Sequence, residues 1–258
     1  MAIWITGHLL ALLVGLSLGL VGSGGSILAV PILVYVLGLE PRSAIAMSLA
    51  IIGIVSLIGV IPHWKQGNIN FKNALTFTPP AMLGAFLGAR LATLSWLSDT
   101  FILVCFAIVT MVAGYLMIHQ PKDNLNDHVE LFVPKQHQSK YPWLVITLKG
   151  LAVGMLTSFV GIGGSFVVIP ALIRSGKILV KEAIGTSLLI IAFKSAAGFV
   201  GYLNRVSIDW NSIFTFTTVT ILGVIWGAYF SGKMHITKLQ RGLGYFLIAV
   251  AIFVLVKS

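Results

Sequence analysis

Lys194 is the residue of this 258-residue chain best placed to do chemistry, because it lies deep within an apolar run, IIAFKSAAGF at 190–199. A lysine inside a membrane segment is costly and by default suggests a functional site. Its ammonium group can bind an anion; the alternative is that it reaches toward the interface or caps a helix end. The acidic residues all lie outside the expected membrane core: Glu40, Asp99, Asp123, Asp127, Glu130, Glu182 and Asp209.

Two glycine-serine breaks, GSGGS at 22–26 and GIGGS at 161–165, offer a second means of binding an anion. A helix that starts after each break presents unpaired backbone N–H groups and the positive end of its dipole, which together bind oxyanions. The serines stand at the expected N-cap positions and the glycines permit close backbone approach. The alternative is that the glycines only permit close helix crossing. The residues expected to bind substrate are Gly24, Gly25, Ser26, Gly163, Gly164, Ser165 and Lys194.

The chain contains an internal repeat. Residues 15–118 align without a gap with residues 154–257, at a constant offset of 139 positions that places Gly24 opposite Gly163. The same offset carries Gly84 and Gly88 onto Gly223 and Gly227, where small residues four apart predict helix packing. The partner of Lys194 under this offset is Val55, so a site that contains Lys194 is asymmetric.

Composition indicates a membrane protein: 57% of the residues are hydrophobic and only 9% are charged. A soluble domain carries roughly 25% charged residues. We expect a first transmembrane repeat at 1–118, a polar linker at 119–142 and a second repeat at 143–258. The first apolar stretch resembles a signal peptide but lacks a basic start, and the repeat begins inside it, so we expect it to be the first helix.

Each half contains five apolar segments, of which the second, expected at 27–38 and at 166–174, is too short to cross a bilayer. Short, broken segments at matching places in two halves point to a transporter's binding site. The expected fold is therefore an all-α polytopic membrane protein of two inverted repeats. Whether the first two segments cross fully or form a re-entrant hairpin stays open.

The basic residues favour five segments in each half. With that number, Arg42, Arg90, Arg205 and Lys257 face one side and 12 other lysines and arginines face the opposite side. With four crossings in each half the same residues divide 8 against 8. Since basic residues favour cytoplasmic loops, we expect a cytoplasmic linker and both termini outside.

Several function classes are disfavoured. The scattered histidines match no metal-ligand spacing, no Lys-Ser/Thr follows the glycines as in a nucleotide-binding loop, and no intramembrane acid pair, HExxH or Ser with a nearby His suggests an enzyme. We therefore expect no cofactor, no metal, no catalytic residue and no nucleic-acid partner.

Two stretches, GLVGSGGSILAVPIL and SFVGIGGSFVVIPAL, carry a resemblance to a known family. Together with AIAMSLA, AIGTSLL, GAFLGARLA and GVIWGAYFSGK they resemble the duplicated signature of the TauE/SafE family of membrane transporters. The resemblance covers nearly the whole chain outside the linker. It implies export or uptake of sulfur-containing anions such as sulfite, thiosulfate or organosulfonates.

The expected function is a secondary transporter that moves a small anion across the plasma membrane by alternating access. An anion channel and a membrane scaffold are the alternatives. The expected partners are the anionic substrate and the lipid bilayer, and a homo-oligomer is compatible with the sequence.

Overall fold

The computed structural model describes residues 2–21, 25–119, 142–176, 178, 180–231 and 236–257, which form helices and no strand. The first half contains α1 (Ala2–Val21), α2 (Ala29–Pro31), α3 (Pro41–Lys65), α4 (Phe71–Ala92) and α5 (Asp99–Ile118). A 3₁₀ turn, η1 (Gly25–Leu28), precedes α2 and a π-helical turn, η2 (Ile32–Val36), follows it. The second half contains α6 (Pro142–Val160), α7 (Ser165–Gly176), α8 (Val180–Tyr202), α9 (Trp210–Ser231) and α10 (Ile236–Lys257).

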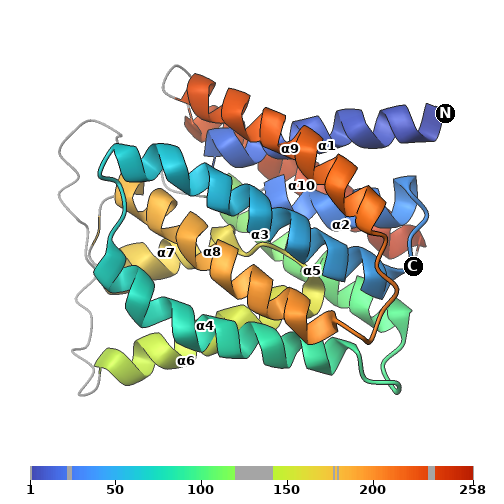
Figure 1. The fold of residues 1–258 in the computed structure, drawn as a ribbon, viewed down its shortest axis with the longest axis horizontal. Coiled ribbons are helices and arrows are strands. Elements are labelled where there is room, and N and C mark those ends of the chain that lie inside the picture. The colour runs from blue at the N-terminus through green and yellow to red at the C-terminus, as the bar shows by residue number, and fades with distance from the viewer. Residues whose placement is uncertain are drawn as a thin grey trace.

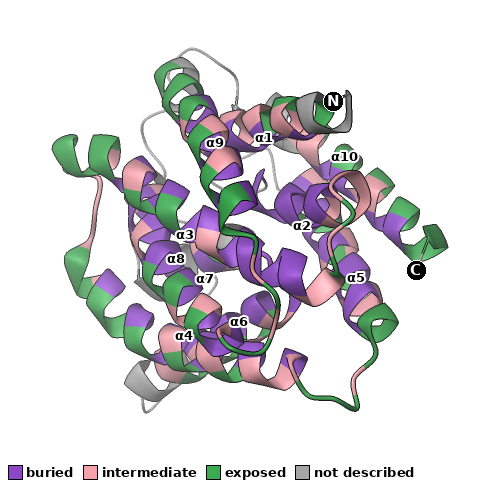
Figure 2. Cartoon of the chain, turned by 45° about the vertical axis from the view of Figure 1, so that its right-hand side comes forward, coloured by how far each residue is buried: buried purple, intermediate pink, exposed green. Residues whose placement is uncertain are grey.

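Four of the described helical stretches are long and apolar enough to cross a membrane: Pro41–Lys65, Asp99–Ile118, Glu182–Tyr202 and Trp210–Gly227. Large apolar side chains such as Leu75, Phe214 and Val256 are exposed on the outer helices, whereas α3 is largely buried (Figure 2). An apolar exterior suits lipid rather than water. The expected all-α polytopic membrane fold is confirmed.

The two halves interleave, because α1 packs on α9, α4 on α6, α3 on α8, and α5 on α10 (Figure 1). Glycines bring two of these pairs into backbone contact. A Cβ atom on Gly84 or Gly88 would lie 2.1 or 2.2 Å from the carbonyl oxygens of Leu151 and Met155 on α6. In the other half, a Cβ atom on Gly223 or Gly227 would lie 2.4 or 2.5 Å from those of Leu12 and Leu16 on α1.

These contacts repeat under the offset of 139 that takes Leu12 to Leu151, so the same interface is built twice. The packing role expected for the four glycines is confirmed.

The central helices α3 and α8 run in opposite directions. The hydroxyl of Ser43, at the start of α3, lies 3.0 Å from that of Ser207, beyond the end of α8. At the other end, the backbone N–H of Asn70, beyond α3, donates to Thr186 near the start of α8 over 2.9 Å. Since α3 and α8 are equivalent segments, the repeats are inverted. We call the two ends of the bundle the Arg42 end and the Lys65 end.

The first two segments of each half form a hairpin. Gly7 of α1 packs against Leu37, and Gly25 packs against Val14 and Leu18, so α1 and the segment Gly25–Val36 are antiparallel. The first hairpin therefore enters from the Arg42 end. In the second half α6 is parallel to α4, and α7 leads back to α8, so that hairpin enters from the Lys65 end.

The tips of the two hairpins meet halfway along α3. A Cβ atom on Gly163 would lie 2.7 Å from the Cβ of Ser26 and 3.0 Å from the side chain of Ile52, near the middle of α3. Both tips lie at mid-height of the bundle, an arrangement that favours re-entrant hairpins over full crossings.

Two details differ from the sequence prediction. The short segments occupy Gly25–Val36 and Ser165–Gly176 rather than 27–38 and 166–174. Gly164 has a φ of +73°, which glycine adopts readily, so the chain can turn into α7 one residue earlier than expected. The carbonyl of Gly164 accepts from the N–H of Val168, which makes Gly164 the N-cap and Ser165 the first helical residue.

Candidate functional site

The side chain of Lys194 is fully buried near the middle of α8, and it is the one buried charged side chain among the described residues. Its Nζ donates a hydrogen bond of 2.7 Å to Oγ1 of Thr157 on α6. The Thr157 hydroxyl in turn lies 2.7 Å from the carbonyl oxygen of Val153, one turn earlier on its own helix. Since an ammonium group has three N–H donors, this bond leaves two of them for another partner.

The same ammonium group lies at the N-terminus of α7. A Cβ atom on Gly164, the N-cap, would lie 3.3 Å from Nζ of Lys194 and 2.4 Å from Cγ2 of Thr157. The first N–H groups of a helix have no partner within the helix, and its dipole places about half a positive charge there. A full and a partial positive charge therefore meet at one point, which is the arrangement that an anion stabilises.

Ser26 lies beside this point. Its side chain is 1% exposed, and its Oγ has no hydrogen-bond partner among the described residues. Gly163, which packs against Ser26, is bonded to Gly164, which packs against Lys194. Consecutive Cα atoms are about 3.8 Å apart, so the free hydroxyl and the ammonium flank one peptide unit of the second break.

Further buried hydroxyls near this level lack partners among the described residues: Ser56, Ser158 and Ser195. Ser195 follows Lys194 and packs near Gly53 of α3, and Ser56 lies one turn beyond Gly53. Ser158 follows Thr157 and packs against Gly198. Buried hydroxyls without partners are costly, so these serines are suited to a polar ligand.

Three other hydroxyl-bearing residues of α3 and α8 have structural contacts. The Ser48 hydroxyl lies 2.9 Å from the carbonyl oxygen of Gly161, which ties α3 to the second break. Thr186 accepts from Asn70, and Ser187 donates to the carbonyl of Ile184 on its own helix. These three residues are occupied by packing and secondary structure.

Of the expected site residues, Ser26, Gly163, Gly164 and Lys194 come together at this point. Gly25 instead packs against α1, where a Cβ atom would lie 2.5 Å from the carbonyl oxygen of Val14. Gly24 lies outside the described residues, and of Ser165 only the backbone is described. The two helix starts are also unlike each other, because α7 is a regular helix of 12 residues whereas the first segment is 3₁₀, α and π in turn.

Sequence reasoning missed Thr157, the hydrogen-bond acceptor of Lys194. Under the offset of 139 its equivalent is Leu18, so the repeat gave no sign of a polar role. The available signal was a Thr-Ser pair shortly before a glycine break in an apolar helix.

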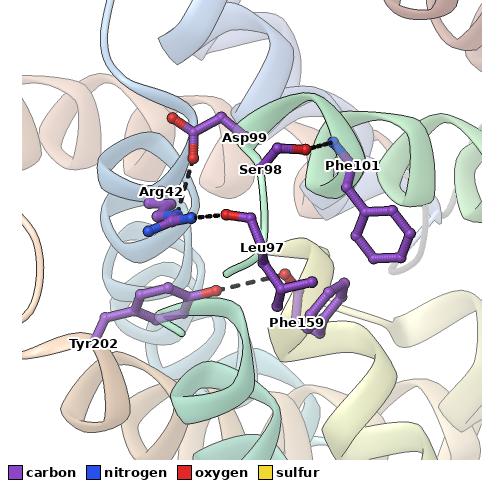
Figure 3. Close-up of polar contacts among 7 residues, drawn as sticks. All are labelled: Arg42, Leu97, Ser98, Asp99, Phe101, Phe159 and Tyr202. Atoms are coloured by element: carbon purple, nitrogen blue, oxygen red, sulfur yellow. Dashed lines mark hydrogen bonds and ion pairs between the residues drawn. The ribbon is translucent and has the colours of Figure 1, made fainter. Parts of the chain in front are cut away.

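A second polar cluster closes the Arg42 end (Figure 3). The Arg42 guanidinium forms an ion pair of 2.9 Å with Asp99 and donates to the carbonyl of Leu97. Tyr202 is buried nearby, and its hydroxyl donates to the carbonyl of Ser158 over 3.2 Å. These contacts hold α8 to α6 and α3 to the start of α5.

Inverted repeats around one buried cationic site are a construction used by secondary transporters. Residues 8–254 match the family described as sulfite exporter TauE/SafE, and the chain belongs to this family of membrane transporters. It is 34% identical over 255 residues to a "Probable membrane transporter protein" of Xylella fastidiosa (strain 9a5c), a match that spans 95% of this chain and 92% of that protein.

Two further relatives carry similar names. "Probable membrane transporter protein YdhB" of Bacillus subtilis (strain 168) is 27% identical, over 91% of this chain and 93% of that protein. A "Probable membrane transporter protein" of Haemophilus influenzae is 27% identical, over 96% and 97%. No solved structure matches the chain.

Proposed function

We propose that this protein carries a small sulfur-containing oxyanion, such as sulfite, thiosulfate or an organosulfonate, across the plasma membrane by alternating access. One observation carries the proposal: the Lys194 ammonium lies at Gly164, the N-terminus of α7, and the Ser26 hydroxyl, which has no partner among the described residues, lies against the preceding Gly163. The family name supports the sulfur chemistry, because it is given for sulfite export.

Electrostatics explain why this arrangement favours an anion. Half a positive charge about 4 Å from a full one is repelled by about 2 kcal/mol at an effective dielectric of 20. An oxyanion between them replaces this repulsion with two attractions, and the N–H groups of α7 and the serine hydroxyls supply hydrogen bonds. No buried carboxylate among the described residues competes for the ammonium.

The two hairpins support alternating access. They enter from opposite ends and meet at the site, so each end of the bundle has one hairpin that can open or close the path to it. For the orientation we propose a cytoplasmic linker, with both termini outside. The lipid bilayer covers the apolar exterior, and a second copy of the chain is a further proposed partner.

Counterflow in proteoliposomes tests the proposed function. Vesicles loaded with unlabelled sulfite should accumulate labelled sulfite, with saturation and with inhibition by an organosulfonate. A channel with the same site would conduct without counterflow, and a scaffold would leave the anion outside. Vesicles without the protein measure the passive leak of sulfite across the bilayer.

A further inference from the structure

We infer that the site takes its substrate as a monoanion and that Lys194 alone sets this charge preference. The inference rests on the proposed function and narrows its choice of anion, because hydrogensulfite and simple organosulfonates carry one negative charge whereas thiosulfate carries two.

The charges of the described residues give the first step. Lys194 is the one charged side chain among the buried polar residues; the others are serines and threonines. The remaining described charges with printed surroundings sit at helix ends, where Asp99 neutralises Arg42 and Arg90 lies over the ring of Phe86. The buried site therefore holds one formal positive charge.

The repeat gives the second step. The offset of 139 that relates Ser56 to Ser195 relates Val55 to Lys194 and Leu18 to Thr157. Val55 and Leu18 are 0% and 4% exposed, so they occupy equivalent buried places. At one of the two equivalent positions the chain has Lys194 with its acceptor Thr157, and at the other it has the apolar side chains of Val55 and Leu18.

The consequence follows from the cost of net charge in an apolar interior. A monoanion beside Lys194 makes a neutral pair, whereas a dianion leaves one uncompensated negative charge, and unpaired buried charge is strongly disfavoured. The helix end and the serine hydroxyls stabilise a charge as dipoles, but they do not cancel it. A dianion would therefore carry a net charge through the low-dielectric core at each transport step.

Two matched pairs of anions test the inference by titration calorimetry on the purified protein at pH 7. Methanesulfonate and sulfate are both tetrahedral, with one and two negative charges. Isethionate and sulfoacetate share a two-carbon sulfonate skeleton and differ in the same way. We expect each monoanion to bind at least tenfold more tightly than its dianion.

Three outcomes overturn the inference. Equal or tighter binding of sulfate and sulfoacetate would show that the site accepts two charges, while counterflow of sulfite would leave the proposed function standing. Binding of none of the four anions, together with absent sulfite counterflow, would remove both. Tight binding of the monoanions that survives Lys194→Met would show that Lys194 does not set the charge.

A variant of the equivalent position gives a second measurement. Val55→Lys places a second cation opposite the first and should raise the affinity for sulfate relative to methanesulfonate at least tenfold. Val55→Met is the control of similar size, and its preference should match the unmodified protein. An unchanged preference in folded Val55→Lys contradicts the inference; should that variant not fold, the matched pairs decide on the unmodified protein.

Discussion

Replacing Lys194 with methionine should move stability and binding in opposite directions. Methionine keeps the length and the apolar stem of lysine but removes the charge that faces the N-terminus of α7. A residue whose role is purely structural would lower both quantities when replaced. A residue that is retained for anion binding can destabilise the protein when no anion is bound, so replacing it should stabilise the anion-free protein.

The magnitudes follow from the distances. Removing the ammonium relieves about 2 kcal/mol of repulsion from the helix end, at half a charge, about 4 Å and a dielectric of 20. It also removes the bond of 2.7 Å to Thr157, whose net worth is about 1 kcal/mol. The empty variant should therefore be more stable by about 1 kcal/mol. The lost attraction for the anion is about 4 kcal/mol before desolvation, so we expect affinity to fall at least tenfold, which corresponds to about 1.4 kcal/mol.

The assay combines thermal unfolding in detergent with calorimetric titration of sulfite on the same preparations. Lys65→Met, an equal charge change at an exposed helix end, is the control and should alter neither quantity. Lys194→Arg keeps the charge and should retain part of the affinity. An unfolding temperature that falls while sulfite affinity stays unchanged would refute the reasoning and make Lys194 a structural residue.

The remaining predictions concern Thr157, the glycines of the two breaks and the cap of α9. Thr157→Val removes the acceptor of Lys194 and should weaken sulfite binding about fivefold, or about 1 kcal/mol, whereas Thr157→Ser keeps the hydroxyl and should bind normally; equal affinity of both variants would contradict a positioning role. Gly164→Ala should weaken binding, because it strains a φ of +73° and places a Cβ atom 3.3 Å from Nζ of Lys194. Gly25→Ala should chiefly lower the unfolding temperature, since its Cβ atom would meet the backbone of α1. The expectation for the two glycines would be contradicted if Gly25→Ala chiefly weakened binding and Gly164→Ala chiefly lowered the unfolding temperature. Asp209 caps α9, and its hydrogen bond from the Ser212 hydroxyl lowers the pKa of its carboxyl group, so its stabilisation is present above the unfolded pKa of about 3.9 and is lost as pH falls through the lower folded pKa. Asp209→Ala should therefore lower the free energy of unfolding by about 0.5 kcal/mol at pH 7 and by less in acid. A gap in unfolding temperature between the variant and the unmodified protein that widens in acid would contradict this sign.

Much of the fold could be predicted because the gene duplication left a readable record. The offset of 139 that pairs Gly84 with Gly223 holds through both halves, and it gave the five segments of each half. Small residues four apart predicted close packing, which the contacts of Gly84 with Leu151 and of Gly223 with Leu12 confirm. Periodicity and composition are local properties, and they were sufficient for these features.

The meeting of the hairpins could not be read from the sequence, because it depends on contacts between residues 137 positions apart, such as Ser26 and Gly163. The different roles of Gly25 and Gly164 were also hidden, since both stand at equivalent places in similar motifs. Their φ angles and neighbours separate them: Gly164 has a positive φ beside Lys194, and Gly25 lies against Val14. Thr157 was missed because no motif marks a residue that acts through another side chain.

The position of a bound anion tests the central claim most directly. Selenite is a heavier analogue of sulfite, and its anomalous scattering in crystals of the protein would locate it without reference to a model of the site. We predict one peak within hydrogen-bond distance of Nζ of Lys194 and the first N–H groups of α7, beside Ser26, and no peak there in Lys194→Met. A selenite peak elsewhere in the membrane core, with this point unoccupied in a protein that transports sulfite, would contradict the account.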